Sequence, residues 1–132
     1  MALRLTLKPN ERLIIGGAVV KNGKARTELV VENEVPILRE RDILSPRAAT
    51  TPCRRIYLAI QLMYVEPERL AQHYTAYFDL VRAVAEAAPS TLKFIGPMND
   101  DIVGRRYYQA LKNARHLVDY EQELLSHGEE RA

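Results

Sequence analysis

The chain has 132 residues, of which 47% are hydrophobic and 27% charged, and its net charge is +2; these are the proportions of an ordinary globular protein. The single cysteine, Cys53, excludes an internal disulfide and a cysteine-based zinc site, and indicates a reducing compartment. Because there is neither an apolar run of the roughly 20 residues that a membrane span needs nor a signal peptide, we expect a cytoplasmic protein with no membrane contact.

The first 44 residues have the pattern of β-strands joined by turns. Leu3, Leu5 and Leu7 alternate with polar residues, which is the period of a half-buried strand. The segment 8–11, Lys-Pro-Asn-Glu, predicts a turn, because proline presets the first turn position and asparagine tolerates the second. The chain is therefore expected to begin with a strand and a tight turn.

Three further strands are predicted before residue 45. Residues 12–20 are apolar but contain Gly16-Gly17, which indicates a bulge or a bend. The pair Asn22-Gly23 is the strongest short hairpin signal and predicts the turn into a strand over residues 25–33. Residues 37–43 read as an edge strand, because Pro36 cannot donate to a ladder.

The pattern becomes helical after a short linker at residues 45–50. Thr51 and Pro52 have the residue types of a helix cap and a first helical position. Glu66-Pro67 starts a second helix, with an apolar face at helical spacing, and Pro89-Ser90 ends it.

We expect one more long helix at the C-terminal end. Gly96-Pro97 should stop a short segment that begins at Thr91, and Asn99 should cap the last helix. The two aspartates that follow Asn99 would then lie at the positive end of that helix.

These elements predict an α+β fold. A small antiparallel β module at residues 1–44 is joined by the linker at 45–50 to a helical hairpin or bundle at 51–132.

Charge is distributed unevenly along the chain. Residues 1–55 contain eleven Lys/Arg and six Asp/Glu, a net of +5, whereas residues 56–132 contain eight and eleven, a net of −3. Such asymmetry indicates a half that faces a polyanion and a half that faces solvent or protein. Ordinary scatter over 55 residues is the alternative.

Motifs of catalysis are absent from the sequence. It has no phosphate-cradling glycine motif, no nucleophile elbow and no metalloprotease helix. His73, His116 and His127 are too widely spaced to suggest a ligand pair, and no base is identifiable for Cys53, which we interpret as a buried thiol. We therefore expect no enzyme activity, no metal site and no cofactor.

Basic and small polar residues on two strands are the candidate binding residues. Arg4, Thr6 and Lys8 share one strand face, and Arg39 and Arg41 share another. Such side chains can reach phosphates or base edges, although an alternating charged face is more often simply solvated.

The order of residues adds two resemblances. The first covers about 45 residues and is carried by Leu5-Thr6-x4-Glu11-x-Leu13-x-Ile15-Gly16 together with Arg39-Glu40. It is similar to the carbon storage regulator family, small β proteins that bind the 5′ leaders of mRNAs through the first strand and an Arg-Glu pair on the last. By analogy with that family, the resemblance implies a homodimer formed through the sheet.

The second resemblance spans nearly the whole chain and is to the FlbT family. It is carried by residues 5–19 (LTLKPNERLIIGGAV), 38–44 (LRERDIL), 51–57 (TPCRRIY) and 107–112 (YYQALK). It implies post-transcriptional repression of flagellum biogenesis through association with the 5′ untranslated region of flagellin mRNA, which promotes its degradation. It also implies partnership with FlaF or flagellin.

From these observations we expect the β module at residues 1–44 to bind RNA, not DNA, and the helical region at residues 51–132 to contact protein. The predicted contacts are Arg4, Thr6, Lys8, Arg12, Arg39 and Arg41. We expect Arg39→Ala to weaken RNA binding and to leave thermal unfolding nearly unchanged. The alternative is a protein adaptor or chaperone-like binder of flagellin or of a flagellar regulator, with no direct RNA recognition.

Overall fold

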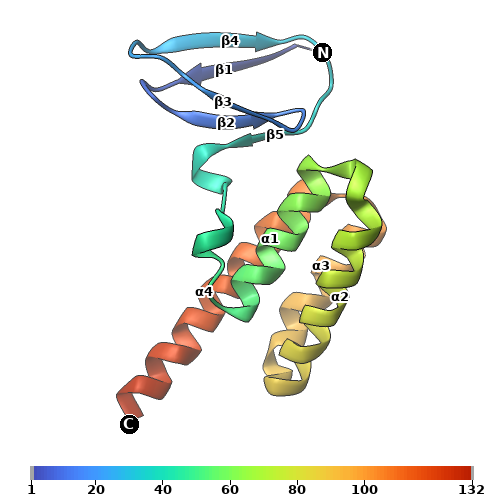
Figure 1. Cartoon of the computed structure of the whole chain (residues 1–132). Coiled ribbons are helices and arrows are strands. Elements are labelled where there is room, and N and C mark those ends of the chain that lie inside the picture. Colours follow the sequence, from blue (N-terminus) through green and yellow to red (C-terminus); the bar gives the residue numbers. More distant parts are fainter. Residues whose placement is uncertain (1, 132) are drawn as a thin grey trace. The chain divides into compact units, whose positions relative to one another are not determined.

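The computed structural model describes residues 2–131, and their side chains as far as residue 127 (Figure 1). The chain divides between Ile43 and Leu44 into a β unit and a helical unit. Residues 45–50, expected as a linker, belong to the helical unit and contain a 3₁₀-helix at Pro46–Ala48 and the buried Ala49. The α+β fold expected from the sequence is confirmed.

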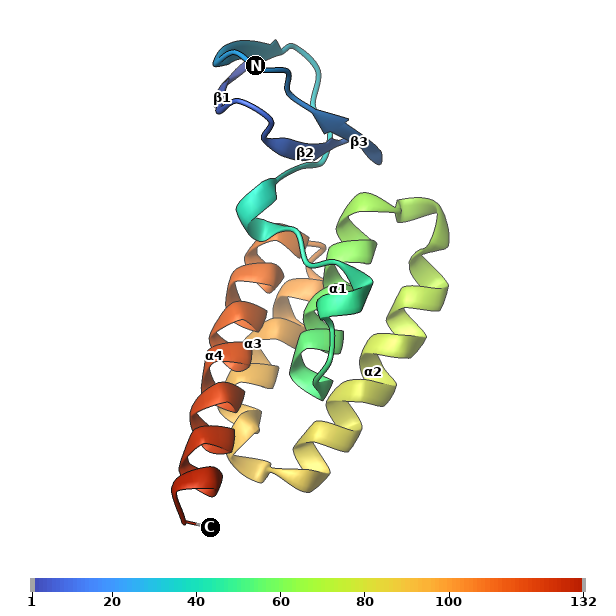
Figure 2. The same cartoon turned by 60° about the vertical axis from the view of Figure 1, so that its left-hand side comes forward.

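From residue 2 to residue 43, the β unit contains five strands in two small antiparallel sheets. The strands are β1 (Leu3–Leu7), β2 (Arg12–Ile15), β3 (Ala18–Lys21), β4 (Thr27–Val31) and β5 (Ile37–Arg39). One sheet pairs β1 with β4, and the other has the order β3-β2-β5. Figures 1 and 2 show the two sheets facing each other.

The space between the sheets is filled by alternate strand residues. Leu5 and Leu7 from β1 and Leu13 from β2 form a buried cluster. The half-buried side chains that pack against it come from every strand except β1: Ile15, Val20, Leu29, Val31 and Ile37. The strand period of two therefore places these residues inward and leaves their neighbours on the outer faces.

Of two predicted turns, the structure contains one as expected and lacks the other. Asn10 adopts a φ of 63° and the N–H of Glu11 donates to the carbonyl of Lys8, so the turn expected at residues 8–11 is confirmed. The hairpin expected at Asn22-Gly23 is wrong. The tight hairpin joins β2 to β3 at Gly16-Gly17, whose φ angles of 56° and 87° are both positive, as a type I′ turn requires.

Asn22 instead anchors the crossing from one sheet to the other. Its side-chain amide donates to the carbonyls of Lys8, at 2.8 Å, and Ala25, at 3.0 Å. Its backbone N–H donates to the carbonyl of Glu11 at 2.8 Å. Because β3 and β4 lie in different sheets, the Asn-Gly pair changes the direction of the chain without pairing its flanking strands.

Within the described residues, the helical unit has four α-helices. They are α1 (Pro52–Val65), α2 (Leu70–Ala87), α3 (Leu92–Val103) and α4 (Tyr107–Arg131). Figures 1 and 2 show α1 between α2 and α4. The helix start predicted at residue 51 is confirmed, because the Thr51 hydroxyl accepts a hydrogen bond from the N–H of Arg54.

The stop predicted at Gly96-Pro97 is wrong, because α3 runs through both residues. A proline inside a helix costs about 3 kcal/mol. Ile95, Met98 and Ile102 are all buried, and each such side chain contributes roughly 1.5–3 kcal/mol, so burial of this face outweighs the proline.

Asn99 is consequently inside α3 rather than at the start of the last helix. Its side-chain oxygen accepts a 2.6 Å hydrogen bond from the hydroxyl of Tyr77. Asp101 accepts from the Nε of Arg106, at 3.1 Å, and from Asn113, at 2.7 Å. The polar residues expected to cap α4 thus tie α3 to α2 and to the first turns of α4.

None of the helices within residues 2–131 combines the length and apolar composition needed to cross a bilayer.

Candidate functional site

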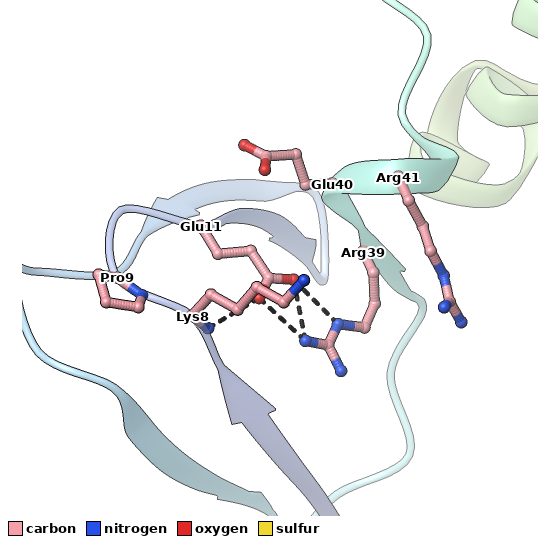
Figure 3. Close-up of a pocket in the computed structure, with 6 residues that line it drawn as sticks. All are labelled: Lys8, Pro9, Glu11, Arg39, Glu40 and Arg41. Carbon is pink, nitrogen blue, oxygen red and sulfur yellow. Dashed lines mark hydrogen bonds and ion pairs between the residues drawn. The ribbon is translucent and has the colours of Figure 1, made fainter.

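A polar pocket of about 290 Å³ lies in the β unit, beside the turn that follows β1 and the end of β5 (Figure 3). It is lined by Lys8, Pro9, Glu11, Arg39, Glu40 and Arg41. Three of the six predicted RNA contacts, Lys8, Arg39 and Arg41, are therefore brought together from two segments far apart in the sequence.

The centre of the pocket is an ion pair between Glu11 and Arg39. The guanidinium donates from Nε to Oε2 at 3.1 Å and from Nη2 to both carboxylate oxygens, at 3.0 and 2.9 Å. The Glu11 side chain is 10% exposed and that of Arg39 is 31% exposed. The backbone N–H of Lys8, which donates to Glu11 at 2.9 Å, and then the Arg39 hydrogen bonds hold the pKa of Glu11 below its ordinary value.

Arg39 also connects the two sheets. Its Nη2 donates to the backbone carbonyl of Thr6 at 2.7 Å, which links β5 of one sheet to β1 of the other. Among the described residues its Nη1 makes no hydrogen bond, and Figure 3 shows this nitrogen pointing away from Glu11. Because these contacts tie the two sheets together, we now expect Arg39→Ala to destabilise the β unit, in place of the expectation that unfolding would be nearly unchanged.

The remaining lining residues give the pocket a positive balance. Glu40 accepts a hydrogen bond from the backbone N–H of Arg12 at 3.2 Å. The Arg41 side chain is 79% exposed and lies 3.9 Å from Asp42, and Lys8 is exposed. With three cations and two carboxylates in its lining, the pocket suits a phosphate oxygen.

The other predicted contacts lie elsewhere. Arg4 and Thr6 are exposed on the outer face of the β1-β4 sheet, where Arg4 lies 3.8 Å from Glu28. Arg12 is exposed on β2, in the other sheet. The six residues thus do not form one patch.

Sequence reasoning missed Glu11 as the organiser of the pocket. The available signal was an acidic residue directly after the Pro-Asn turn, which returns its carboxylate to the N–H of Lys8. Its pairing with Arg39 joins residues 28 positions apart and has no local signature.

The structural division also changes the charge argument. The β unit, through Ile43, contains eight Lys/Arg and six Asp/Glu, a net of +2, and the helical unit contains eleven of each, a net of zero. The asymmetry seen between residues 1–55 and 56–132 depends on Arg47, Arg54 and Arg55, which belong to the helical unit. The location of individual cations is therefore more informative than the balance of each half.

Cys53 has the environment of an unreactive thiol. It is 2% exposed, and burial followed by the nearby carboxylate of Glu121 raises its pKa to about 12. Glu121, on α4, accepts hydrogen bonds from the hydroxyl of Thr51 and, at 3.1 Å, from the backbone N–H of Cys53. Its carboxylate therefore helps to cap the N-terminal end of α1. Within the described residues, no three His, Cys, Asp or Glu side chains form a group that could hold a metal ion.

Comparison with known proteins identifies the family. A family model described as flagellar protein FlbT matches residues 3–125. The chain belongs to the FlbT family. The resemblance found in the sequence is thereby confirmed.

Three FlbT relatives illustrate the similarity. The Bradyrhizobium diazoefficiens protein named probable flagellum biosynthesis repressor protein FlbT 1 is 49% identical over 125 residues, 94% of this chain and 85% of the relative. A Rhodopseudomonas palustris protein named probable flagellum biosynthesis repressor protein FlbT is 39% identical, and the match covers 96% of this chain and 99% of the relative. The Caulobacter vibrioides flagellum biosynthesis repressor protein FlbT is 37% identical, with 96% and 92% covered. No solved structure matches the FlbT chain significantly.

Proposed function

We propose that this protein is a regulator, not an enzyme, that represses flagellum biosynthesis after transcription. In this proposal the β unit associates with the 5′ untranslated region of flagellin mRNA, and the message is then degraded by a separate nuclease. Repression of flagellum biosynthesis is the activity in the names of its FlbT relatives, which match almost the whole chain.

The observation that carries the RNA part is the pocket around Glu11 and Arg39. It gathers the exposed cations Lys8 and Arg41 beside an arginine whose outward-pointing Nη1 has no hydrogen bond among the described residues. A carboxylate that receives most of the Arg39 hydrogen bonds also fixes its guanidinium plane, so Nη1 is held ready for a phosphate without further loss of side-chain entropy.

Phosphate contacts of this kind make affinity depend on salt. For single-stranded nucleic acid, the logarithm of the affinity falls with the logarithm of salt concentration with a slope of about −0.7 per neutralised phosphate. Discrimination between RNAs must come from base contacts, which salt weakens less.

The test is binding of the purified protein to a labelled flagellin 5′ leader and to a shuffled RNA of equal length, across a salt series. We expect preference for the leader that survives moderate salt, and we expect Lys8→Ala combined with Arg41→Ala to weaken binding by about tenfold with a smaller salt slope. Arg47→Ala, an exposed charge loss in the helical unit, is the matched control and should bind like the wild type.

A second candidate function is a protein adaptor that binds flagellin. The observation that favours it is an apolar pocket of about 330 Å³ in the helical unit, lined on α2 by Ala83, Val84 and Ala87 and on α4 by Leu124. Equal and weak binding of both RNAs, together with stoichiometric binding of purified flagellin that Ala87→Trp abolishes, would replace the RNA proposal by this one.

A further inference from the structure

Two like charges face each other across the β2-β3 hairpin. The antiparallel register places Arg12 directly opposite Lys21, and both are exposed. No ion pair with either side chain occurs among the described residues. On its other side Arg12 has the carboxylate of Glu40, which accepts a hydrogen bond from the backbone N–H of Arg12 at 3.2 Å.

Such a pair destabilises a sheet, since directly opposite residues have Cβ atoms only about 4.5–5.5 Å apart. The outer face of the β1-β4 sheet shows the usual solution. There Arg4 has a diagonal acidic neighbour, Glu28, at 3.8 Å. Lys21 lies on the edge strand β3 and has no acidic residue opposite or diagonal to it on β2, so a bound anion beside Lys21 would relieve the repulsion.

The surface beside this pair is apolar. Val19 is two positions before Lys21 on β3, so it lies on the same face of the sheet, and it is 71% exposed. Two cations beside an exposed aliphatic side chain suit a ligand that alternates negative groups with apolar rings. Single-stranded RNA has this chemistry, because its unpaired bases are free to contact a protein surface.

We propose that the outer face of the β2-β3 hairpin is a second RNA contact, at which Arg12 and Lys21 together hold the backbone of a single-stranded segment and Val19 contacts a base. This inference rests on the proposed RNA-binding function and extends it from the pocket lined by Lys8 and Arg41 to the β2-β3 hairpin.

The test uses the full-length Lys21→Glu variant, which converts the repulsion into an attraction. Because Arg12 in the free protein then faces a carboxylate instead of an ammonium group, the melting temperature should rise by about 1–4 °C. Affinity for the labelled flagellin leader should fall by about fivefold or more, and the salt slope should decrease by about 0.7, one phosphate contact. A residue with only a structural role would not raise stability while lowering RNA affinity.

Lys24→Glu is the matched control, because Lys24 carries the same charge, is exposed and lies outside the strands. It should leave the melting temperature unchanged and reduce affinity less than Lys21→Glu does. Val19→Asp should weaken binding of the leader, because Val19 is proposed to contact a base. Polyphosphate has no bases, so its affinity should fall only by the effect of one added negative charge.

The outcomes separate this inference from the proposed function. Wild-type affinity of Lys21→Glu, or an equal loss in Lys24→Glu, would overturn the second contact, and the proposed function would stand if the variants at Lys8 and Arg41 still lost binding. Absence of leader preference in the wild type would overturn both.

Discussion

The two units of this FlbT family member are stabilised differently. Among the described residues of the helical unit, seven large side chains are at most 1% exposed: Ile56, Ile60, Met63, Tyr77, Met98, Ile102 and Leu117. By the same measure the smaller β unit has three, Leu7, Leu13 and Leu38, and the cluster between its sheets is completed by half-buried side chains. A chain segment of about 40 residues buries too little surface to be stable on apolar contacts alone, so the β unit depends more on specific polar bonds.

This difference concerns function as well as stability. The polar bonds of the β unit, between Glu11, Arg39 and the carbonyl of Thr6, lie in the pocket proposed to bind RNA. In the proposed function Arg39 would serve stability and binding together, whereas Lys8 and Arg41 are exposed and do not make the bond between the sheets. Substitutions can test whether the two units depend on such different interactions.

The largest expected effect is in the helical core. Ile60→Ala should lower the free energy of unfolding by about 3–4 kcal/mol, because it leaves a cavity at a side chain that is 0% exposed. Urea unfolding followed by the helical circular dichroism signal measures the change. Val103→Ala, at a side chain that is 78% exposed, is the control and should have almost no effect; comparable losses in the two variants would contradict a concentrated helical core.

Arg39→Ala should have the largest effect in the β unit for a surface-accessible residue. It should lower the free energy of unfolding of this unit by about 2 kcal/mol, because Glu11 loses its partner and the carbonyl of Thr6 loses a donor. Hydrogen exchange of the β1 and β5 amides reports on this unit separately. Arg4→Ala removes only an exposed pair at 3.8 Å and should change exchange little; if both variants behave alike, the link between the sheets contributes nothing.

The smallest effect is a pH dependence confined to acid. The pKa of Glu11 in the folded protein lies below its ordinary value of 4.5. Its stabilising contribution is thus present above about pH 4.5 and is lost as the pH falls through the lowered value. Glu11→Gln should flatten this acid dependence in β-unit amide exchange measured from about pH 6 to about pH 3, and an unchanged profile would show that another carboxylate determines it.

The sequence alone determined those features that depend on neighbouring residues. Pro9 and Asn10 specify the turn after β1, and Thr51 and Pro52 specify the start of α1, because the required backbone angles and cap hydrogen bond involve residues within a few positions. The change from strand to helical periodicity also predicted the α+β fold. Of the candidate site, the sequence predicted the basic residues but not their grouping.

Tertiary structure decided the rest, since it depends on contacts between distant residues. Burial of Ile95, Met98 and Ile102 carries α3 through Pro97, against the local preference of that residue. The hairpin forms at Gly16-Gly17 because the strands beside it pair, whereas those beside Asn22 join different sheets. Likewise, Arg39 becomes a link between sheets, and Arg12 a like-charged neighbour of Lys21, only when strand register places them there. The free energies that decide these features come from strand pairing and side-chain burial, which no local pattern of residues encodes.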